Sequence, residues 1–148
     1  MPKIDLAALP VRTGSGYPPA FQSAVAGREV RDLTKGGGLT DFIANQVTLP
    51  PGAWSSQRHW HEDEDELVVI LSGEAVLVDD HGSTRLGPGE VADFPKNDGN
   101  GHHLRNESDR DCVFLAIGLA DRSLCHYPDI DLLWSRATGD THRDGTPY

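Results

Sequence analysis

The sequence has no long apolar run and few basic residues. Across its 148 residues, no stretch approaches the roughly 20 apolar residues that a membrane helix needs. The opening segment, residues 1–5, lacks the charged and then apolar pattern of a secretory signal peptide. Only 13 basic residues stand against 23 acidic ones, and the formal net charge of -10 repels nucleic-acid phosphates and anionic membranes. We therefore expect a soluble, cytoplasmic protein with no direct nucleic-acid or membrane partner.

Cysteine is also scarce. Cys112 and Cys125 are the only two, and they lack the close pairing of a zinc ribbon or a redox motif. A cytosolic protein keeps its thiols reduced, so we expect two reduced, partly buried cysteines. The length matches one compact domain that can bury a real core.

Glycine and proline are plentiful, with 16 and 10 copies, and they interrupt short apolar runs. This composition favours strands joined by turns over a helix bundle. Eight strands are predicted, over residues 41–49, 53–60, 66–71, 74–78, 83–86, 91–94, 102–105 and 112–119. The fold class is therefore all-β, an antiparallel sandwich or jelly-roll barrel. Residues 67–71 are apolar on both faces, which predicts a central strand covered on each side.

The two ends of the chain have a different pattern. Residues 1–38 predict an N-terminal arm that packs on the barrel or on a second subunit, with a short helix near 21–26 and a glycine triplet at its end. Residues 39–120 form the predicted barrel. Residues 121–148 form a C-terminal tail, predicted as a loop at 121–127 and a short helix within 128–134, which folds back across the barrel or frays.

One stretch has the pattern of a metal site. His59 and His61 are two residues apart, so on a strand both imidazoles point to the same side. A polar turn follows, and Glu66 begins the next strand, where a hairpin can bring its carboxylate to the two histidines. His102 follows a glycine-rich turn and can approach from another part of the sheet. Imidazole and carboxylate together suit one divalent ion of Zn, Fe, Mn, Co, Ni or Cu.

These residues resemble a known pattern. The spacing of Gly52, six residues, His59-x-His61, four residues, Glu66, six residues and a final glycine is similar to the first signature of the cupin superfamily. A second stretch resembles the other cupin signature: five residues separate Gly89 from Pro95, and His102 lies four positions before Asn106. It departs by two residues, because the step from Pro95 to Gly99 is longer than usual.

The resemblance covers roughly residues 39–119 and implies a double-stranded β-helix. It also implies that His59, His61, Glu66 and His102 bind one metal ion. Adjacent strand residues face opposite sides, and the cupin spacing selects His102 over His103, which then faces outward or lines the loop.

Catalytic residues are not evident in the motifs. Gln57 shares strand parity with the two histidines and either lines the cavity or is a hydrogen-bonded residue at the barrel end. Lys96, like Arg58 and Arg105, is a cation near the motifs that could hold an anionic substrate, although surface charge is the commoner role. Tyr127 is a candidate to cover the barrel mouth, with His126 and Trp134. By default, solvent exposure is expected for His81, His126 and His142, and packing roles for Trp54 and Trp60.

Cupins include dioxygenases, isomerases, lyases, decarboxylases, storage proteins and sugar-binding modules, so the resemblance does not assign one reaction. The first hypothesis is a metal-dependent enzyme acting on a small polar metabolite: a sugar, a sugar phosphate, or a hydroxy or keto acid, by an isomerase, lyase or dioxygenase reaction. The alternative is a non-catalytic cupin that binds or senses a carbohydrate-like molecule. The resemblance and the apolar residues of the arm also predict a homodimer.

Overall fold

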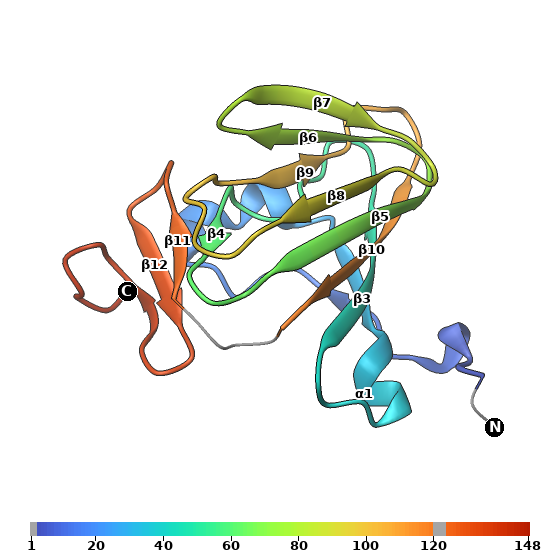
Figure 1. Cartoon of the computed structure of the whole chain (residues 1–148), viewed down its shortest axis with the longest axis horizontal. Coiled ribbons are helices and arrows are strands. Elements are labelled where there is room, and N and C mark those ends of the chain that lie inside the picture. Colours follow the sequence, from blue (N-terminus) through green and yellow to red (C-terminus); the bar gives the residue numbers. More distant parts are fainter. Residues whose placement is uncertain (1–2, 120–123) are drawn as a thin grey trace.

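The computed structural model describes residues 3–119 and 124–148, and most of its regular structure is β-strand (Figure 1). One short α-helix is present, α1 (Leu33–Gly37), with 3-10 turns at Leu6–Ala8, Pro19–Phe21 and Ser23–Val25. The strands are β1 (Arg12–Thr13), β2 (Glu29–Asp32), β3 (Ile43–Leu49), β4 (Trp60–His61), β5 (Glu66–Ser72), β6 (Ala75–Asp79), β7 (Gly82–Leu86), β8 (Val91–Phe94), β9 (His103–Arg105), β10 (Cys112–Gly118), β11 (Cys125–Tyr127), β12 (Leu132–Ser135) and β13 (Gly139–Thr141). In the described part of the chain, no helix is long and apolar enough to cross a membrane.

The strands form antiparallel sheets that enclose one main core. The large sheet has the order β1-β2-β3-β10-β5-β8, and a smaller one has the order β7-β6-β9. Figure 1 shows the small sheet above the large one. Residues of both sheets, such as Ile70 and Phe114 from one and Leu104 from the other, share the core. The predicted all-β jelly-roll barrel is confirmed.

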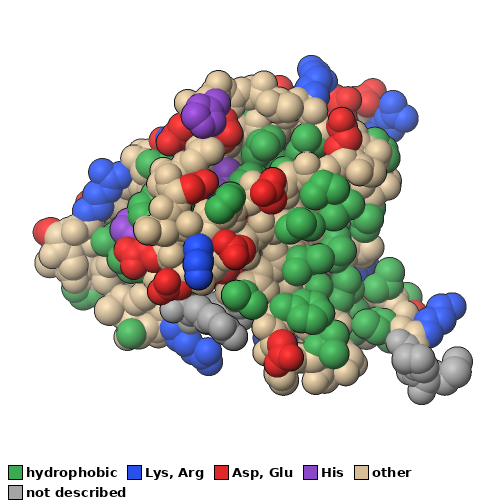
Figure 2. Space-filling model, viewed as in Figure 1, with side chains coloured by type: hydrophobic (Ala, Val, Ile, Leu, Met, Phe, Trp, Pro, Cys, Tyr) green, Lys and Arg blue, Asp and Glu red, His purple; other side chains and the backbone are tan. Residues whose placement is uncertain are grey.

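Strand β5 shows how the apolar run is used. It lies between β10 and β8, so its predicted central position is confirmed. Val68 and Ile70 are buried in the core, whereas Leu71 is 48% exposed. In the single chain, the prediction that both faces of β5 are covered is therefore wrong. Figure 2 shows a band of hydrophobic side chains along this side of the molecule.

The arm contributes strands to the barrel. Strand β2 pairs with β3 and β1 pairs with β2, so residues before position 39 extend the large sheet. In place of the helix predicted near 21–26, the chain makes two 3-10 turns. Asp32 caps the first turn of α1. The glycine triplet ends this helix, because Gly38 adopts a φ of 72° at its C-terminus.

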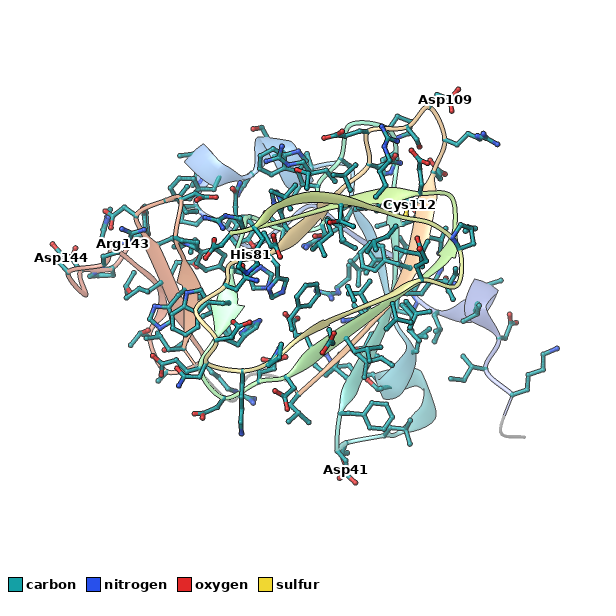
Figure 3. The ribbon with its side chains drawn as sticks, turned by 45° about the horizontal axis from the view of Figure 1, so that its top comes forward. Asp41, His81, Asp109, Cys112, Arg143 and Asp144 are labelled. Carbon is teal, nitrogen blue, oxygen red and sulfur yellow. The ribbon has the colours of Figure 1, made fainter. Side chains whose placement is uncertain are left out.

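The tail forms a third sheet, of order β13-β12-β11-β4. The helix predicted within 128–134 is wrong, because β12 pairs with β11 and β13 instead. This pairing buries Leu132 completely in a second apolar cluster with Cys125 and Tyr127. The predicted boundary at 120 and the first residues of the predicted loop, 121–123, lie outside the described residues. In Figure 3, Arg143 and Asp144 mark the outer end of this tail.

The predicted strand at 53–60 is also wrong over most of its length, because only its last residue belongs to β4. The backbone donors of this segment go to different elements: Trp54 N–H donates to Ala24 O, and Ser55 N–H donates to Leu104 O. Trp54 and His59 make only isolated bridges, to Arg105 and His102. An irregular segment tied at several points therefore leads into the site.

Candidate metal centre

Four candidate ligands come from different parts of the sheet system. His61 ends β4, Glu66 begins β5, and His102 immediately precedes β9. His59 and His102 form an antiparallel bridge in which each backbone N–H donates to the other residue's carbonyl, at 3.1 and 2.9 Å. The predicted hairpin is wrong, because β4 pairs with β11 and β5 pairs with β10 and β8, so the acidic turn carries the chain from one sheet to another. This turn and the bridge together bring residues more than 40 positions apart to one point.

Three imidazoles meet one carboxylate oxygen. Glu66 Oε2 lies 2.9 Å from His102 Nε2, 3.4 Å from His61 Nε2 and 3.6 Å from His59 Nε2. The ring centroids of His59 and His61 are 5.0 Å apart, although these residues do not share one regular strand. Ligand atoms of His59, Glu66 and His102 all lie within 4.8 Å of one another.

The opposite ring nitrogens hold two of these histidines in place. His59 Nδ1 lies 2.9 Å from Gln57 O and 3.1 Å from Ser56 Oγ. His102 Nδ1 faces Asn100 O at 3.4 Å. A proton on Nδ1 that is donated to a carbonyl leaves the Nε2 lone pair directed toward Glu66, which is the orientation that a metal-binding imidazole needs.

The electrostatics of the cluster also fit a cation. Burial raises the pKa of Glu66, but hydrogen bonds from His102, His59 and His61 outweigh burial and hold that pKa well below its usual range. For His61, burial lowers the pKa, but the Cys125 thiol and Glu66 outweigh burial and raise it to about 11. The cluster thus holds one ionised carboxylate among the imidazoles, and burial lowers the pKa of His102, which keeps its Nε2 available as a ligand. Three nitrogens and one oxygen are a donor set for a divalent transition metal.

The cluster forms one wall of a cavity of about 410 Å³. This volume suits a small metabolite. Its lining includes polar groups beyond the four ligands, from the arm, from the acidic turn and from the tail: Arg12, Tyr17, Arg28, Glu64, Cys125 and Tyr127. The cavity therefore combines the candidate ligands with cations, a carboxylate and phenols.

The candidate catalytic residues have different positions. Tyr127 lines the cavity, and its ring centroid lies 5.9 Å from that of His59. Gln57 does not line it, because its Nε2 donates to Phe21 O at 2.9 Å and anchors the arm. Lys96 is exposed and outside the lining, and its backbone N–H donates to Asp65 Oδ1 at 2.8 Å.

The other residues singled out in the sequence have structural partners. Arg58 is held by Asp129 at 2.7 Å and also pairs with Asp80, and the Arg105 guanidinium lies 4.2 Å above the Trp54 ring. His103, expected to face outward or line the loop, is buried, with Nδ1 3.0 Å from Ser56 O. Burial lowers its pKa to about 4, so it is neutral.

His126 is another residue whose expected exposure is wrong. Its ring stacks on Trp60 with centroids 4.0 Å apart, and its Nε2 lies 2.8 Å from Glu62 Oε1. The packing role expected for Trp60 agrees with this contact. His81 is exposed, as expected.

Sequence reasoning did not identify Cys125, Glu64 or Arg28 as residues of the site. The Cys125 sulfur lies within 4.8 Å of ligand atoms of His59 and His61. It reaches this position because β11 pairs with β4 and sets Cys125 opposite His61. That pairing spans more than 60 positions, and no local pattern indicates it. The position of Glu64 had a local signal, since it lies two residues before Glu66 in the polar turn.

Comparison with known proteins places these observations in a family. The sequence profile of the family described as Cupin domain matches residues 45–118. No curated protein matches the chain. Among solved structures, it is similar to one from Silicibacter pomeroyi DSS-3, described as a sugar phosphate isomerase from a cupin superfamily. That likeness has 39% identity and a TM-score of 0.93, and it covers 99% of this chain and 96% of the other.

Two further structures extend the comparison. The polyketide cyclase RemF from Streptomyces resistomycificus has 21% identity and a TM-score of 0.71, covers 86% of this chain and 85% of that one, and supports the fold alone. The cupin domain of an XRE family transcriptional regulator from Enterobacter cloacae has 29% identity and a TM-score of 0.53. That likeness covers 65% of this chain and 99% of the regulator's domain. Similar barrels thus occur in proteins with different described roles.

Proposed function

Because this chain belongs to the cupin superfamily, we propose that it is a metal-dependent enzyme acting on a small polar metabolite inside the barrel. The convergence of three imidazole nitrogens on Glu66 Oε2, at the wall of a cavity of about 410 Å³, is the observation that carries the proposal. His59, His61, Glu66 and His102 would hold one divalent ion of Zn, Fe, Mn, Ni, Co or Cu. Such an ion supplies Lewis-acid polarisation of a substrate oxygen, or activation of O2 when it is iron.

Among the reaction classes, isomerisation of a sugar phosphate has the most support. The Silicibacter pomeroyi protein, described as a sugar phosphate isomerase, is 39% identical over nearly the whole chain. Isomerisation moves a proton from the carbon beside a carbonyl, so it needs a base next to the polarised oxygen. Lyase and dioxygenase reactions, and sugars or hydroxy and keto acids as substrates, are the other outcomes of the test below.

Glu64 is the residue that would carry this proton. Among the described residues that line the cavity, it is the only carboxylate besides Glu66. Its Oε2 lies 3.6 Å from His61 Nδ1, on the side of the ring opposite the nitrogen that faces Glu66. A carboxylate in this position can accept a proton from a substrate carbon and return it to the neighbouring carbon.

Glu64→Gln is expected to lower kcat by about 100-fold, because an amide cannot accept the proton. The metal content of this variant should stay at the wild-type value. Asp63→Asn is the matched control, since Asp63 is exposed in the same turn and outside the cavity lining. Loss of metal from Glu64→Gln would instead make Glu64 a ligand, and unchanged turnover would remove it from the mechanism.

The enzyme proposal is tested by a metabolite screen on metal-loaded protein. Sugar phosphates, free sugars, and hydroxy and keto acids are incubated with the protein, with products followed by NMR and O2 uptake by electrode. Turnover of a sugar phosphate without O2 uptake is the expected result, and O2 consumption would assign a dioxygenase. The alternative, a non-catalytic sensing cupin, is favoured by the likeness to the regulator's domain. Ligands that raise the melting temperature but are never converted would support it.

A homodimer in the cytoplasm is the proposed state of the protein. The outward face of the large sheet leaves Leu71 and Val91 on adjacent strands 48% and 54% exposed. Apolar faces of this kind mark interfaces on soluble proteins, and a patch on a two-fold axis can cover its own copy.

Light scattering is expected to give the mass of a dimer for the wild type. A buried lysine is costly, so Leu71→Lys should give a monomer. Thr84→Lys, on an exposed position of β7, should leave the dimer intact. A monomeric wild type would refute the homodimer.

A further inference from the structure

The arm brings two arginines to the cavity that holds the candidate ligands. Arg12 of β1 stands opposite Val30 of β2, and Val30 stands opposite Val47 of β3. Directly opposed residues share one face of a sheet, and Val30 and Val47 both belong to the core. Arg28 is two residues before Val30. All four of these residues line the cavity of about 410 Å³.

Arg28 is a largely buried cation, and its hydrogen-bond partners in the described part of the chain are all neutral. Its Nη1 donates to Ser55 O, and its Nη2 donates to Gly14 O at 3.3 Å. Its Nε is buried and has no hydrogen-bond partner within residues 3–119 and 124–148. The titratable groups that act on it are Tyr17, Tyr127 and Arg12, and none of them is a carboxylate.

Arg58 provides the contrast within the same chain. It lies beside the second histidine motif, and its guanidinium is neutralised by Asp129 and Asp80. A buried cation without such a partner is costly, so it indicates that an anion joins it in the functional state. The planar guanidinium binds phosphate or carboxylate through paired N–H groups.

Two tyrosines connect this cation to the candidate metal centre. Tyr17 contacts Tyr127 edge to face, with ring centroids 5.6 Å apart, and the Tyr127 ring lies 5.9 Å from that of His59. Burial raises the pKa of both phenols, so they are neutral and can donate hydrogen bonds. Cation, phenols and imidazoles thus follow one another along a single cavity.

We propose that Arg28, assisted by Arg12, forms a subsite for the anionic group, a phosphate monoester or a carboxylate, of the metabolite whose reacting carbons face Glu66 and the three histidines. The inference rests on the proposed function, because it assigns the other end of the same substrate. Arg28 is largely buried and would bind the anion directly, whereas the exposed Arg12 would attract it.

The test uses metal-free protein, so that it does not depend on catalysis. After dialysis against EDTA, the full chain is titrated by calorimetry with inorganic phosphate and, separately, with malonate, at constant ionic strength. We expect the wild type to bind at least one of these anions. Tighter binding of phosphate would identify a phosphate ester as the substrate class, and tighter binding of malonate a carboxylate.

Arg28→Gln is expected to weaken anion binding by about 10-fold or more, and Arg28→Lys by less, because lysine keeps the charge without the paired donors. Arg31→Gln is the control, since Arg31 follows Val30 on the same strand and points to its other face, outside the cavity lining. Should Arg28→Gln fail to fold, Arg12→Gln at an exposed position replaces it, with an expected weakening of about 3-fold.

Wild-type protein that binds neither anion, or Arg28→Gln that binds as tightly as wild type, would overturn the subsite. A failure of the proposed function would give different results from a failure of the subsite. Arg28-dependent binding in a protein that never takes up metal would retain the subsite and remove the metal-dependent reaction. Stoichiometric metal uptake without anion binding would retain the metal-dependent reaction and remove the subsite.

Discussion

Replacing Glu66 by glutamine is expected to weaken metal binding by about 70- to 900-fold, since an equal share for each of four ligands in a typical binding free energy of about 10–16 kcal/mol is about 2.5–4 kcal/mol. The carboxylate oxygen that would change is the point where the Nε2 atoms of His59, His61 and His102 meet, at 2.9–3.6 Å. Glutamine has nearly the same shape, but it loses the negative charge that the cluster is built around. Its amide also makes a weaker ligand than a carboxylate.

Competition with a chromophoric chelator measures this change directly. Glu62→Gln is the control, because Glu62 belongs to the same acidic turn but bonds His126 and lies outside the cavity lining. The circular dichroism spectra of both variants should match the wild type. Metal affinity of Glu66→Gln within about 3-fold of wild type would show that this carboxylate is not a ligand.

Gly73→Ala is expected to destabilise the fold by about 3 kcal/mol or more, which combines the cost of a left-handed conformation with a steric overlap. Gly73 turns the chain between β5 and β6 with a φ of +73°. A Cβ there would lie 2.3 Å from Asp111 O and 2.9 Å from Cys112 Cα. Both contacts are with backbone at the start of β10, which pairs with β3 on one side and β5 on the other, so the neighbouring chain has little room to move away.

Urea unfolding of Gly73→Ala and of Gly89→Ala separates the two contributions. Gly89 also has a positive φ, +85°, but a Cβ there would meet nothing within 4 Å. Gly89→Ala should therefore lose only about 1 kcal/mol. Equal losses in the two variants would show that the close approach to residues 111 and 112 contributes nothing.

The barrel could be predicted from the sequence because its strands are short apolar runs bounded by turns. Strand β8 has the predicted bounds, and β3, β5, β6, β7, β9 and β10 differ from prediction by one or two residues. The prediction of a strand at 53–60 failed because the backbone of this segment bonds to Ala24, to Pro50 and, at isolated points, to residues 102–106, so no continuous ladder forms. Hydrophobic pattern alone does not distinguish these two cases.

The candidate site also has residues that the sequence predicts and residues that it does not. Two histidines and a carboxylate within eight positions are visible as a local motif, and the family spacing adds His102. Cys125 and Arg28 reach the cavity only through pairings of the tail with β4 and of the arm with β3. Their own segments contain no motif, and the pairings that position them are non-local. Gln57 is the opposite case. Its strand parity with the two histidines predicts a place in the cavity, but its side-chain amide donates to Phe21 O in the arm.

Metal content is the most direct test of the proposed centre. Wild-type protein, His61→Ala and His81→Ala are expressed with metal supplementation, purified without chelator and analysed by inductively coupled plasma mass spectrometry. His61 belongs to the cluster, whereas His81 is exposed in the turn between β6 and β7. We predict about one divalent ion per chain in the wild type and in His81→Ala, and almost none in His61→Ala. An unchanged metal content in His61→Ala, or a wild type that takes up no metal, would contradict a metal centre at these residues.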